Sequence, residues 1–351
     1  MNTEKMIINR PPSITWYSLG VNGKTVSPLS DSTGAIVGID CPKAVSVMPV
    51  NAELTSGDPT ASGETFAGSF SNGIELSFSE ALTEPVKVNI RLSGLEDKSA
   101  ALYISALEGS KAEILVNIIR EDDTRAGIRT VLYAWDNSDI KLTQIYDCPF
   151  DSEVISDTGI TLMDSASVML NGIFMKARNV LAGTKAVLEG ARSQFDYGLG
   201  YILTGNDSLD LNSVVLHKGK KTLSNTAVRG AMSGESQKVF RGTIDFRAGS
   251  SGSEGGETED VLLLSDSVTN KTMPVILCDE EDVSGSHGAS IGRVPEEQVY
   301  YMMSRGIPYD QVYSMLASSK IEGIINRIED EKTREELSGQ LSRRFSDVIN
   351  G

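Results

Sequence analysis

The sequence predicts a mainly β protein that ends in a small α-helical domain. Between residues 160 and 277 the apolar residues come in short groups separated by Gly, Asn, Asp and Ser, which is typical of short strands closed by polar turns. Signals for tight hairpins are scarce there, and this favours a β-solenoid over a β-sandwich. The groups follow one another irregularly, roughly every ten to twenty residues, so no clean repeat is visible. After residue 292 the apolar residues recur at helical spacing.

The composition excludes several classes of protein. The 351 residues include 48 acidic and 32 basic side chains, and the net charge of −16 argues against a nucleic-acid binder, which needs clustered Lys and Arg. No stretch approaches the roughly 20 apolar residues that span a bilayer. The N-terminus lacks the apolar core of a signal peptide. We therefore expect a cytoplasmic protein that does not contact membranes.

Cysteines and histidines are too few for most metal or hydrolytic sites. Cys41, Cys148 and Cys278 lie far apart and form neither a C-x-x-C pair nor a disulfide framework, so their roles stay open. His217 and His287 are the two histidines, which excludes a metal site built from several imidazoles. A Ser-His-Asp hydrolase would lack the G-x-S-x-G motif that supports such an assignment.

Changes in composition divide the chain into three parts. Residues 1–45 are rich in proline and predict an extended N-terminal segment, residues 46–292 predict the β body, and residues 293–351 predict the helical domain. The first 65 residues are also rich in Gly, Ser and Thr, which predicts edge strands and loops. Residues 165–189 are compatible with a helix or with strands. Residues 250–257 predict a flexible loop.

Three helices are expected in the C-terminal part. Pro295 and the acidic residues after it open the first helix, and Arg305 with Gly306 closes it. Pro308 starts the second helix. The third is expected from residue 335 to residue 348, where apolar residues again recur at helical spacing.

Several short motifs are better explained as turns than as binding sites. Residues 23–25 resemble the end of a phosphate-binding loop but lack its first glycine, and residues 198–200 lack the third glycine of a dinucleotide motif. The lysine-rich residues 217–221 predict a solvated turn, with an anion contact as the alternative. The acids of residues 279–282 lack the spacing of an EF-hand and also predict a solvated turn.

His287 lies in a segment rich in Gly and Ser, between the β body and the helices. Its surroundings do not follow the pattern of a core residue. Two interpretations remain: a structural histidine that makes hydrogen bonds, or a ligand that handles metal or sulfur at an interface.

The segment around His287 resembles a known family. Residues 282–307, which contain Ser-His-Gly-Ala-Ser and end in Ser-Arg-Gly-Ile, resemble the C-terminal signature of the SufB/SufD family, which serves iron–sulfur cluster assembly. Linked motifs in the family's order are more specific than any single motif. The further matches are residues 9–22 with their Thr-Trp pair, His217 with the Lys-Gly-Lys-Lys-Thr-Leu-Ser after it, Arg229-Gly, Phe240-Arg-Gly and Leu262-Leu-Leu-Ser-Asp.

The resemblance implies a fold and a set of partners. The fold would be a right-handed parallel β-helix core followed by a small C-terminal helical domain. The resemblance implies a dimer formed through the β-helix, either with a second copy or with a SufB paralogue. It also implies that the C-terminal helices dock the SufC ATPase. The chain itself would be non-enzymatic, with a transient iron–sulfur cluster at the dimer interface and no permanently bound cofactor.

The resemblance also suggests site residues. His287 matches the interface histidine of the SufD branch and is the candidate cluster or metal ligand. Gly288 stands where the SufB branch carries Glu, and a gap-free count puts Glu259 at the position of a SufB cysteine. Both departures indicate a SufD-like or reduced member rather than a self-sufficient SufB scaffold. Glu259 and Cys278 are weaker ligand candidates, and Cys278 matches no ligand of the family.

The C-terminal helices carry more large apolar side chains than a small domain buries. Tyr and Met are adaptable side chains of the kind enriched at interfaces, so we expect them to contact the ATPase. Residues 318–320 depart from the Gly-Phe-like pair that is common in the family. The candidate contact residues are Tyr301, Met302, Arg305, Tyr309, Tyr313 and Met315.

Two other classes of protein remain as alternatives. A β-helix carbohydrate-active enzyme would need several acids or bases that converge on one strand face, and such enzymes are usually exported. A purely structural interaction protein would carry no ligand chemistry. We expect a subunit of an iron–sulfur assembly complex, because the linked motifs favour it and no export signal is present.

Overall fold

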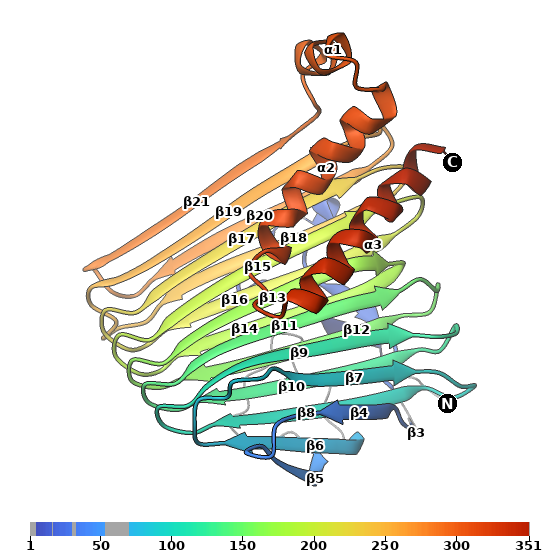
Figure 1. Cartoon of the computed structure of the whole chain (residues 1–351). Coiled ribbons are helices and arrows are strands. Elements are labelled where there is room, and N and C mark those ends of the chain that lie inside the picture. The colour runs from blue at the N-terminus through green and yellow to red at the C-terminus, as the bar shows by residue number, and fades with distance from the viewer. Residues whose placement is uncertain (1–4, 16, 30–32, 53–69, 351) are drawn as a thin grey trace.

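The chain folds into a β-solenoid, which confirms the predicted mainly β body. The structure is a computed structural model that describes residues 5–15, 17–29, 33–52 and 70–350. The solenoid has about eight turns. Each turn contributes one strand to each of two sheets that lie face to face (Figure 1).

Sheet A and sheet B run the length of the solenoid, and their neighbouring strands are parallel except where β5 meets β6 and β4 meets β7. In order, sheet A consists of β20 (Thr269–Cys278), β18 (Gln237–Phe246), β16 (Ser208–His217), β14 (Asn179–Leu188), β12 (Val154–Leu162), β10 (Ala126–Ala134), β8 (Lys98–Ala106), β6 (Phe70–Phe78) and β5 (Ser46–Ala52), with β3 (Thr33–Gly34) paired to β8. Sheet B consists of β21 (Val283–Gly292), β19 (Ser253–Leu263), β17 (Leu223–Met232), β15 (Gln194–Leu203), β13 (Ser167–Ala177), β11 (Asp139–Cys148), β9 (Lys111–Arg120), β7 (Val86–Leu92) and β4 (Ile36–Asp40).

Successive turns of the solenoid differ in length. Val154 pairs with Val180 and Gln237 pairs with Thr269, so one turn takes between roughly 26 and 32 residues. The strands from β8 to β21 keep 9 to 11 residues each. Most of the variation therefore lies in the corners, and this hides the repeat from a search for a fixed period.

One corner of the solenoid repeats in the structure without repeating in the sequence. A residue with positive φ is followed by a small buried residue, and the N–H of the first donates a hydrogen bond to a carbonyl of the next turn. Gly and Asn adopt this left-handed conformation most easily, but other residue types occupy it here as well. The six pairs are Gly109-Ser110, Asn137-Ser138, Ser165-Ala166, Arg192-Ser193, Lys221-Thr222 and Gly252-Ser253.

The interior of the solenoid changes from apolar to polar along its length. Side chains alternate along a strand, so residues aligned in register on one face form columns that run from turn to turn. In the early and middle turns these columns consist largely of Val, Ile, Leu and Ala, which form one continuous hydrophobic core. In the last turns buried polar and charged side chains join the columns, among them His217, Lys238, Glu257 and Glu259.

Three helices follow the last strand, as predicted: α1 (Glu296–Ser304), α2 (Tyr309–Ile325) and α3 (Glu331–Asn350). The third begins four residues earlier than expected, because Asp330 Oδ2 accepts the Thr333 N–H at 3.0 Å and thus caps the helix. Among the described residues, none of the helices combines the length and the apolar character that a membrane span requires.

Helix α2 packs on the outer face of sheet B. Its isoleucines are buried against apolar side chains of the sheet. A Cβ on Gly198 would lie 3.0 Å from Ile324 Cδ1, and one on Gly200 would lie 3.1 Å from Ile321 Cγ2. The prediction of a turn at residues 198–200 is therefore wrong, since both glycines lie inside β15 and let the helix approach closely.

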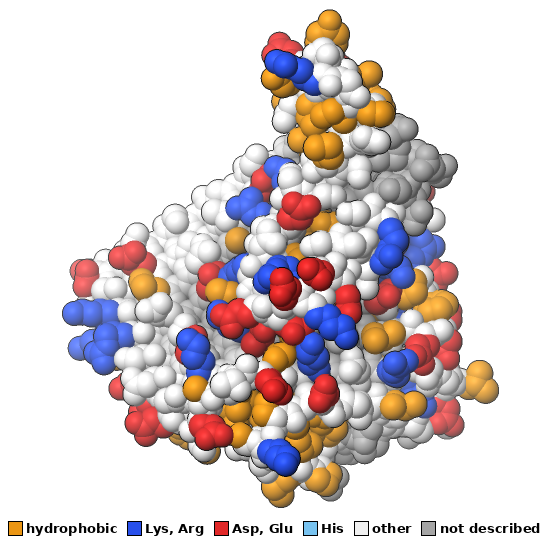
Figure 2. Space-filling model, in the orientation of Figure 1, with side chains coloured by type: hydrophobic (Ala, Val, Ile, Leu, Met, Phe, Trp, Pro, Cys, Tyr) orange, Lys and Arg blue, Asp and Glu red, His pale blue; other side chains and the backbone are white. Residues whose placement is uncertain are grey.

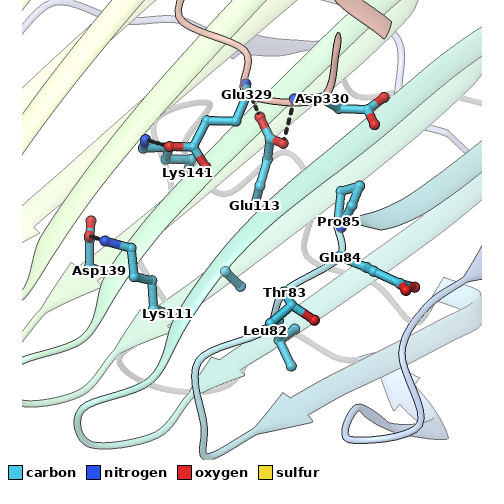
Figure 3. Close-up of a pocket in the computed structure, with 11 residues that line it drawn as sticks. Leu82, Thr83, Glu84, Pro85, Lys111, Glu113, Asp139, Lys141, Glu329 and Asp330 are labelled. Atoms are coloured by element: carbon cyan, nitrogen blue, oxygen red, sulfur yellow. Dashed lines mark hydrogen bonds and ion pairs between the residues drawn. The ribbon is translucent and has the colours of Figure 1, made fainter. Parts of the chain in front are cut away.

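The start of α3 is fixed to the solenoid by a carboxylate (Figure 3). Glu113 of β9 accepts the backbone N–H groups of Glu329 at 2.6 Å and of Asp330 at 2.9 Å. Lys141 forms an ion pair with Glu329, and Lys87 forms one with Asp330 at 2.7 Å. These contacts hold the helical layer at its end farthest from α1.

The N-terminal residues cover part of the outer face of sheet A. Strands β1 (Met6–Ile8) and β2 (Lys24–Val26) form a small antiparallel sheet, with η1 (Tyr17–Leu19) between them in sequence. Ile8 and Val26 pack on Ile155 and its neighbours. The fully buried Arg241 donates hydrogen bonds to the Val21 carbonyl and to both carboxylate oxygens of Asp210.

Four further predictions concern segments of the solenoid. Residues 165–189, compatible with either helix or strand, contain the whole of β13 and β14, and the hairpin-like Asn171-Gly172 pair lies in the middle of β13. The flexible loop predicted at residues 250–257 is wrong beyond Gly252, because β19 begins at Ser253. The solvated turns predicted near residues 218–221 and 279–282 are confirmed, although His217 itself is fully buried at the end of β16.

Candidate functional site at the open end of the solenoid

The two ends of the solenoid are built differently. At the N-terminal end, β4 and β5 add antiparallel strands, and β5 contains Pro49, which cannot donate a backbone hydrogen bond. At the C-terminal end, β20 and β21 are the last strands of their sheets, and no described strand pairs with their outer edges. Nearly every residue of β21 is exposed. We call this C-terminal end the open end.

His287 lies on the inward face of β21 at the open end. It pairs in register with Glu257 of β19, which pairs with Thr226 of β17, which in turn pairs with the core residue Tyr197. Residues in one such column share a face of the sheet. The imidazole of His287 is therefore the exposed last member of a column whose other members are buried.

Cys278 ends a different column, on the inward face of sheet A. It pairs in register with Phe246, which pairs with His217. The thiol lies at the end of β20 and is exposed, so solvent reaches it at the open end. The structure thus places Cys278 and His287 on inward faces of the two opposed sheets, within the same last turn.

A buried ion pair lies one turn below the open end. Lys238 of β18 donates to a carboxylate oxygen of Glu259 and to Thr272 Oγ1, the latter at 3.0 Å. Burial lowers the pKa of Lys238, and the negative charge of Glu259 counteracts that shift. Glu259 Oε2 is buried without a hydrogen-bond partner. The candidate Glu259 is thus already engaged through its other oxygen.

Glu257 is a member of the site that the sequence analysis missed. Its pKa is raised to about 7, mainly by burial and also by the charge of Glu259, while the charge of Lys238 acts in the opposite direction. Its carboxylate fills the space that a side chain at position 242 would need, because a Cβ on Gly242 would lie 1.6 Å from Glu257 Oε2. The alternating acids at 257 and 259, inside a strand rather than a turn, were the available signal.

Both ring nitrogens of His217 are engaged by neighbouring side chains inside the solenoid. Its Nδ1 lies 2.7 Å from Thr222 Oγ1 and its Nε2 lies 2.9 Å from Ser224 Oγ, while its ring packs against Phe246 with the ring centres 4.6 Å apart. Burial lowers its pKa to about 4, so the neutral imidazole is the form that the fold accommodates. His217 therefore offers no free nitrogen to a ligand.

The described residues contain no group of three or more His, Cys, Asp and Glu side chains that could hold a metal ion. Cys148 is fully buried, and burial raises the pKa of its thiol to about 12. Cys41 is half-buried, and all three cysteines are free thiols. In the part of the chain that the structure describes, the side chains at the open end therefore do not form a group of three candidate ligands.

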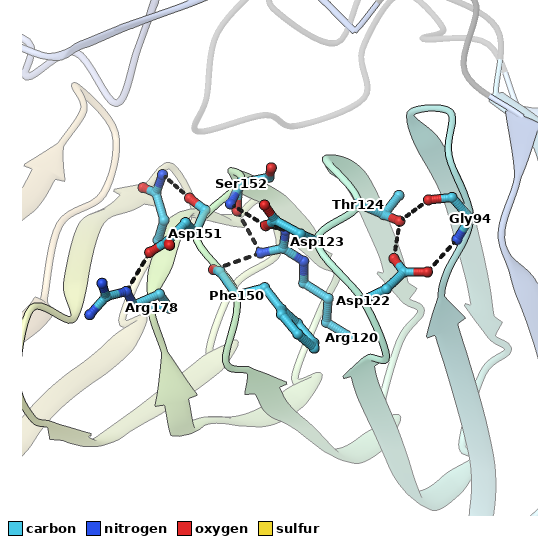
Figure 4. Close-up of polar contacts among 10 residues, drawn as sticks. Gly94, Arg120, Asp122, Asp123, Thr124, Phe150, Asp151, Ser152 and Arg178 are labelled. Atoms are coloured by element: carbon cyan, nitrogen blue, oxygen red, sulfur yellow. Dashed lines mark hydrogen bonds and ion pairs between the residues drawn. The ribbon is translucent and has the colours of Figure 1, made fainter.

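Acids at the corners of the solenoid are occupied by local hydrogen bonds (Figure 4). Asp122 accepts the Gly94 N–H at 2.7 Å and the hydroxyl of Thr124. Asp123 accepts the Ser152 N–H at 2.8 Å and a guanidinium N–H of Arg120 at 2.7 Å. These carboxylates stabilise the corners and are not free to act together on a ligand.

The helices at the open end expose a group of large apolar side chains. Apolar side chains gather where α1 projects beyond the solenoid (Figure 2). Of the predicted contact residues, Tyr301, Tyr309 and Met315 are exposed, whereas Met302 and Tyr313 are half-buried and pack against the cluster beneath α2. The Arg305 guanidinium lies 5.2 Å from the centre of the Tyr301 ring, and the Arg305 N–H donates to the Met302 carbonyl as a helix cap.

The fold and the open end define a β-solenoid protein with a C-terminal helical layer and a polar, uncovered last turn. Residues 93–320 match the family described as SUF system FeS cluster assembly, SufBD core domain. The chain therefore belongs to the SufB/SufD family.

Individual relatives agree with this assignment. The chain is 28% identical over 140 residues to an iron–sulfur cluster assembly protein SufD of Bacillus subtilis, a match that covers 40% of this chain and 32% of that protein. It is 20% identical over 246 residues to the SufD of Escherichia coli, with 69% and 58% of the two chains covered. A chloroplastic SufBD family protein of Arabidopsis thaliana is 26% identical over 145 residues, with 41% and 26% covered. These matches span from about a quarter to little over half of each relative.

Proposed function

We propose that the chain is a non-enzymatic subunit of a cytoplasmic SUF-type complex that assembles iron–sulfur clusters. The observation that carries the proposal is the open end, which presents the imidazole of His287 and the thiol of Cys278 on an uncovered last turn of a SufB/SufD-family solenoid. Imidazole and thiolate are ligands that suit iron and iron–sulfur clusters. The cluster would be cargo that is held for a time and then passed on.

The proposal includes a dimer joined through the open ends, either with a second copy or with a SufB paralogue. The outer edges of β20 and β21 carry backbone donors and acceptors that no described strand satisfies. Long exposed edges of this kind favour pairing with another chain. A partner chain would cover His287 and Cys278 and add the ligands that one chain lacks.

The proposal also assigns the exposed side of α1 and α2 to a SufC-type ATPase. Tyr301 and Tyr309 are more than half exposed, with 57% and 52% of their surface open to solvent, and Met315 is equally open at 52%. Aromatic and Met side chains are enriched at protein interfaces. These residues contribute little to the core, so partner binding explains their apolar character better than packing does.

Co-purification of the full chain with a SufC-type ATPase tests the proposal. Removing residues 308–351 is a poor test, because it would uncover the apolar face of sheet B on which α2 packs. We therefore use the double substitution Tyr301→Ala and Met315→Ala, with Tyr17→Ala on the N-terminal segment as the matched exposed control. The double variant is expected to lose the ATPase and its stimulation at least tenfold, while the control retains both. Full ATPase binding by the double variant would show that the contact lies elsewhere.

A further inference from the structure

The polar layer below the open end holds two buried carboxyl groups, Glu257 and Glu259, but one buried cationic side chain, Lys238, among its described residues. Lys238 pairs with Glu259, and within the described part of the chain Glu257 makes neither a hydrogen bond nor an ion pair. Only 6% of the surface of Glu257 is exposed, so water would compensate little of the charge of its ionised form. The buried, unpartnered Glu259 Oε2 adds a second unsatisfied acceptor to the same layer. The layer therefore favours a positive charge delivered from the open end.

Glu257 and His287 are neighbours across the last pair of strands in sheet B. They are register partners in a parallel ladder, so their Cα atoms lie about 4.8 Å apart and their side chains leave the sheet on the same side. Nothing described covers His287, and Gly288 beside it has open space around its Cα. A ligand that enters from the open end would meet the imidazole first and then the carboxylate, which extends across the interior toward Gly242 of β18.

We propose that Glu257 and His287 together bind a divalent iron ion at the open end. This proposal rests on the proposed function, because it assigns the residue that receives iron within that site. Carboxylate oxygen and imidazole nitrogen are both suitable ligands for ferrous iron. Glu259 remains the counter-charge of Lys238 and is not a ligand in this arrangement.

The site is incomplete without a partner chain. One chain offers two ligands, in agreement with the absence of any group of three ligating side chains among its described residues. If two chains meet through their open ends across a twofold axis, the same pair comes from each chain, and four ligands surround one ion. Four is the number that a tetrahedral site requires. The expected stoichiometry is therefore one metal ion for two chains.

Titration of the full chain with Co²⁺ under anaerobic conditions tests this proposal. Co²⁺ binds a given nitrogen and oxygen site more tightly than Fe²⁺ does and gives a visible spectrum that reports its ligands. We expect Glu257→Gln and His287→Gln each to weaken Co²⁺ binding at least tenfold. Glu254→Gln, an exposed acid of the same strand, serves as the matched control and is expected to stay within twofold of the wild type.

The possible results distinguish a failure of the role of Glu257 from a failure of the proposed function. Wild-type Co²⁺ affinity in Glu257→Gln, or no saturable Co²⁺ binding by the wild type, overturns the role of Glu257. Co-purification with the ATPase, measured on the same proteins, separates this failure from a failure of the proposed function. If Glu257→Gln does not give a cooperative thermal transition, Glu257→Met, which has a similar volume, replaces it.

Discussion

Lys238 and Glu259 form an ion pair inside the solenoid, and solvent reaches 0% and 2% of their side chains. Both charged groups are removed from water, so the charge of each is compensated mainly by the other. The pair lies one turn below the open end, where the interior changes from apolar to polar.

Substituting one member of this ion pair should destabilise the fold more than substituting both members. We expect Lys238→Met or Glu259→Met alone to lower the free energy of unfolding by about 3–5 kcal/mol, because the remaining charge is buried without a partner. The double variant should recover most of that loss. Denaturant unfolding of the four proteins measures the coupling. Additive losses in the double variant would mean that the two side chains do not compensate each other.

The protonation of His217 should make stability depend on pH. The pKa of His217 is lowered from 6.5 to about 4 in the folded state, so its contribution is fully present above pH 6.5 and is lost as pH falls toward 4. The loss amounts to about 3 kcal/mol. We therefore expect the stability advantage of the wild type over His217→Gln to shrink by that amount between pH 7 and pH 4.

An exposed residue without a titratable group provides the control for this pH effect. Leu95 is fully exposed, so Leu95→Gln should track the wild type across the same pH range. Unfolding free energies measured at several pH values check both expectations. A constant difference between the wild type and His217→Gln would contradict the assignment of a buried neutral imidazole.

On the C-terminal helices, the residues that stabilise the fold should differ from those that bind a partner. Ile321 is 1% exposed and packs between α2 and sheet B, so Ile321→Ala should cost about 2–5 kcal/mol of stability. Tyr301→Ala should change stability by less than about 0.5 kcal/mol, since that side chain is mostly exposed. Thermal or denaturant unfolding distinguishes the two. A large loss from Tyr301→Ala would assign that side chain to the core.

A new charge at the open end should prevent dimer formation. Ala289 is exposed and is the register partner of Glu259, so Ala289→Asp adds a negative charge to a face that is already acidic. We expect this variant to sediment as a monomer at micromolar concentration, whereas the wild type sediments as a dimer. Leu95→Asp is the control, because Leu95 is fully exposed on a distant turn. An unchanged dimer in Ala289→Asp would place the interface elsewhere.

Sequence patterns predicted the architecture because they follow from local chemistry. Pro295 and Pro308 stand at the N-caps of α1 and α2, and Gly306 with positive φ follows the end of α1. The repeat escaped detection, since the corner positions require only a left-handed backbone and a small buried neighbour. Arg192 and Lys221 meet the first requirement with side chains that look like ordinary surface residues.

The candidate site was predicted in part. Its Gly/Ser-rich surroundings indicate His287 as a site residue, whereas Glu257 cannot be identified in this way, because burial of a carboxylate depends on register with neighbouring turns. The loop predicted at residues 250–257 also includes Glu257, and a residue in such a loop is not expected to be buried. Composition rich in Gly, Ser and Glu indicates a loop, but here Gly255 faces the interior, where a Cβ would lie 2.7 Å from Ile244 Cγ2.

The difference between the two ends of the solenoid sets a limit on its growth into larger assemblies. A filament needs a contact that repeats head to tail, with the open end of one chain seated on the opposite end of the next. At that opposite end β4 and β5 run antiparallel to the other strands, and Pro49 removes a donor from β5. It does not continue the parallel pattern, so the proposed association through open ends would close after two chains and would not extend along the solenoid axis.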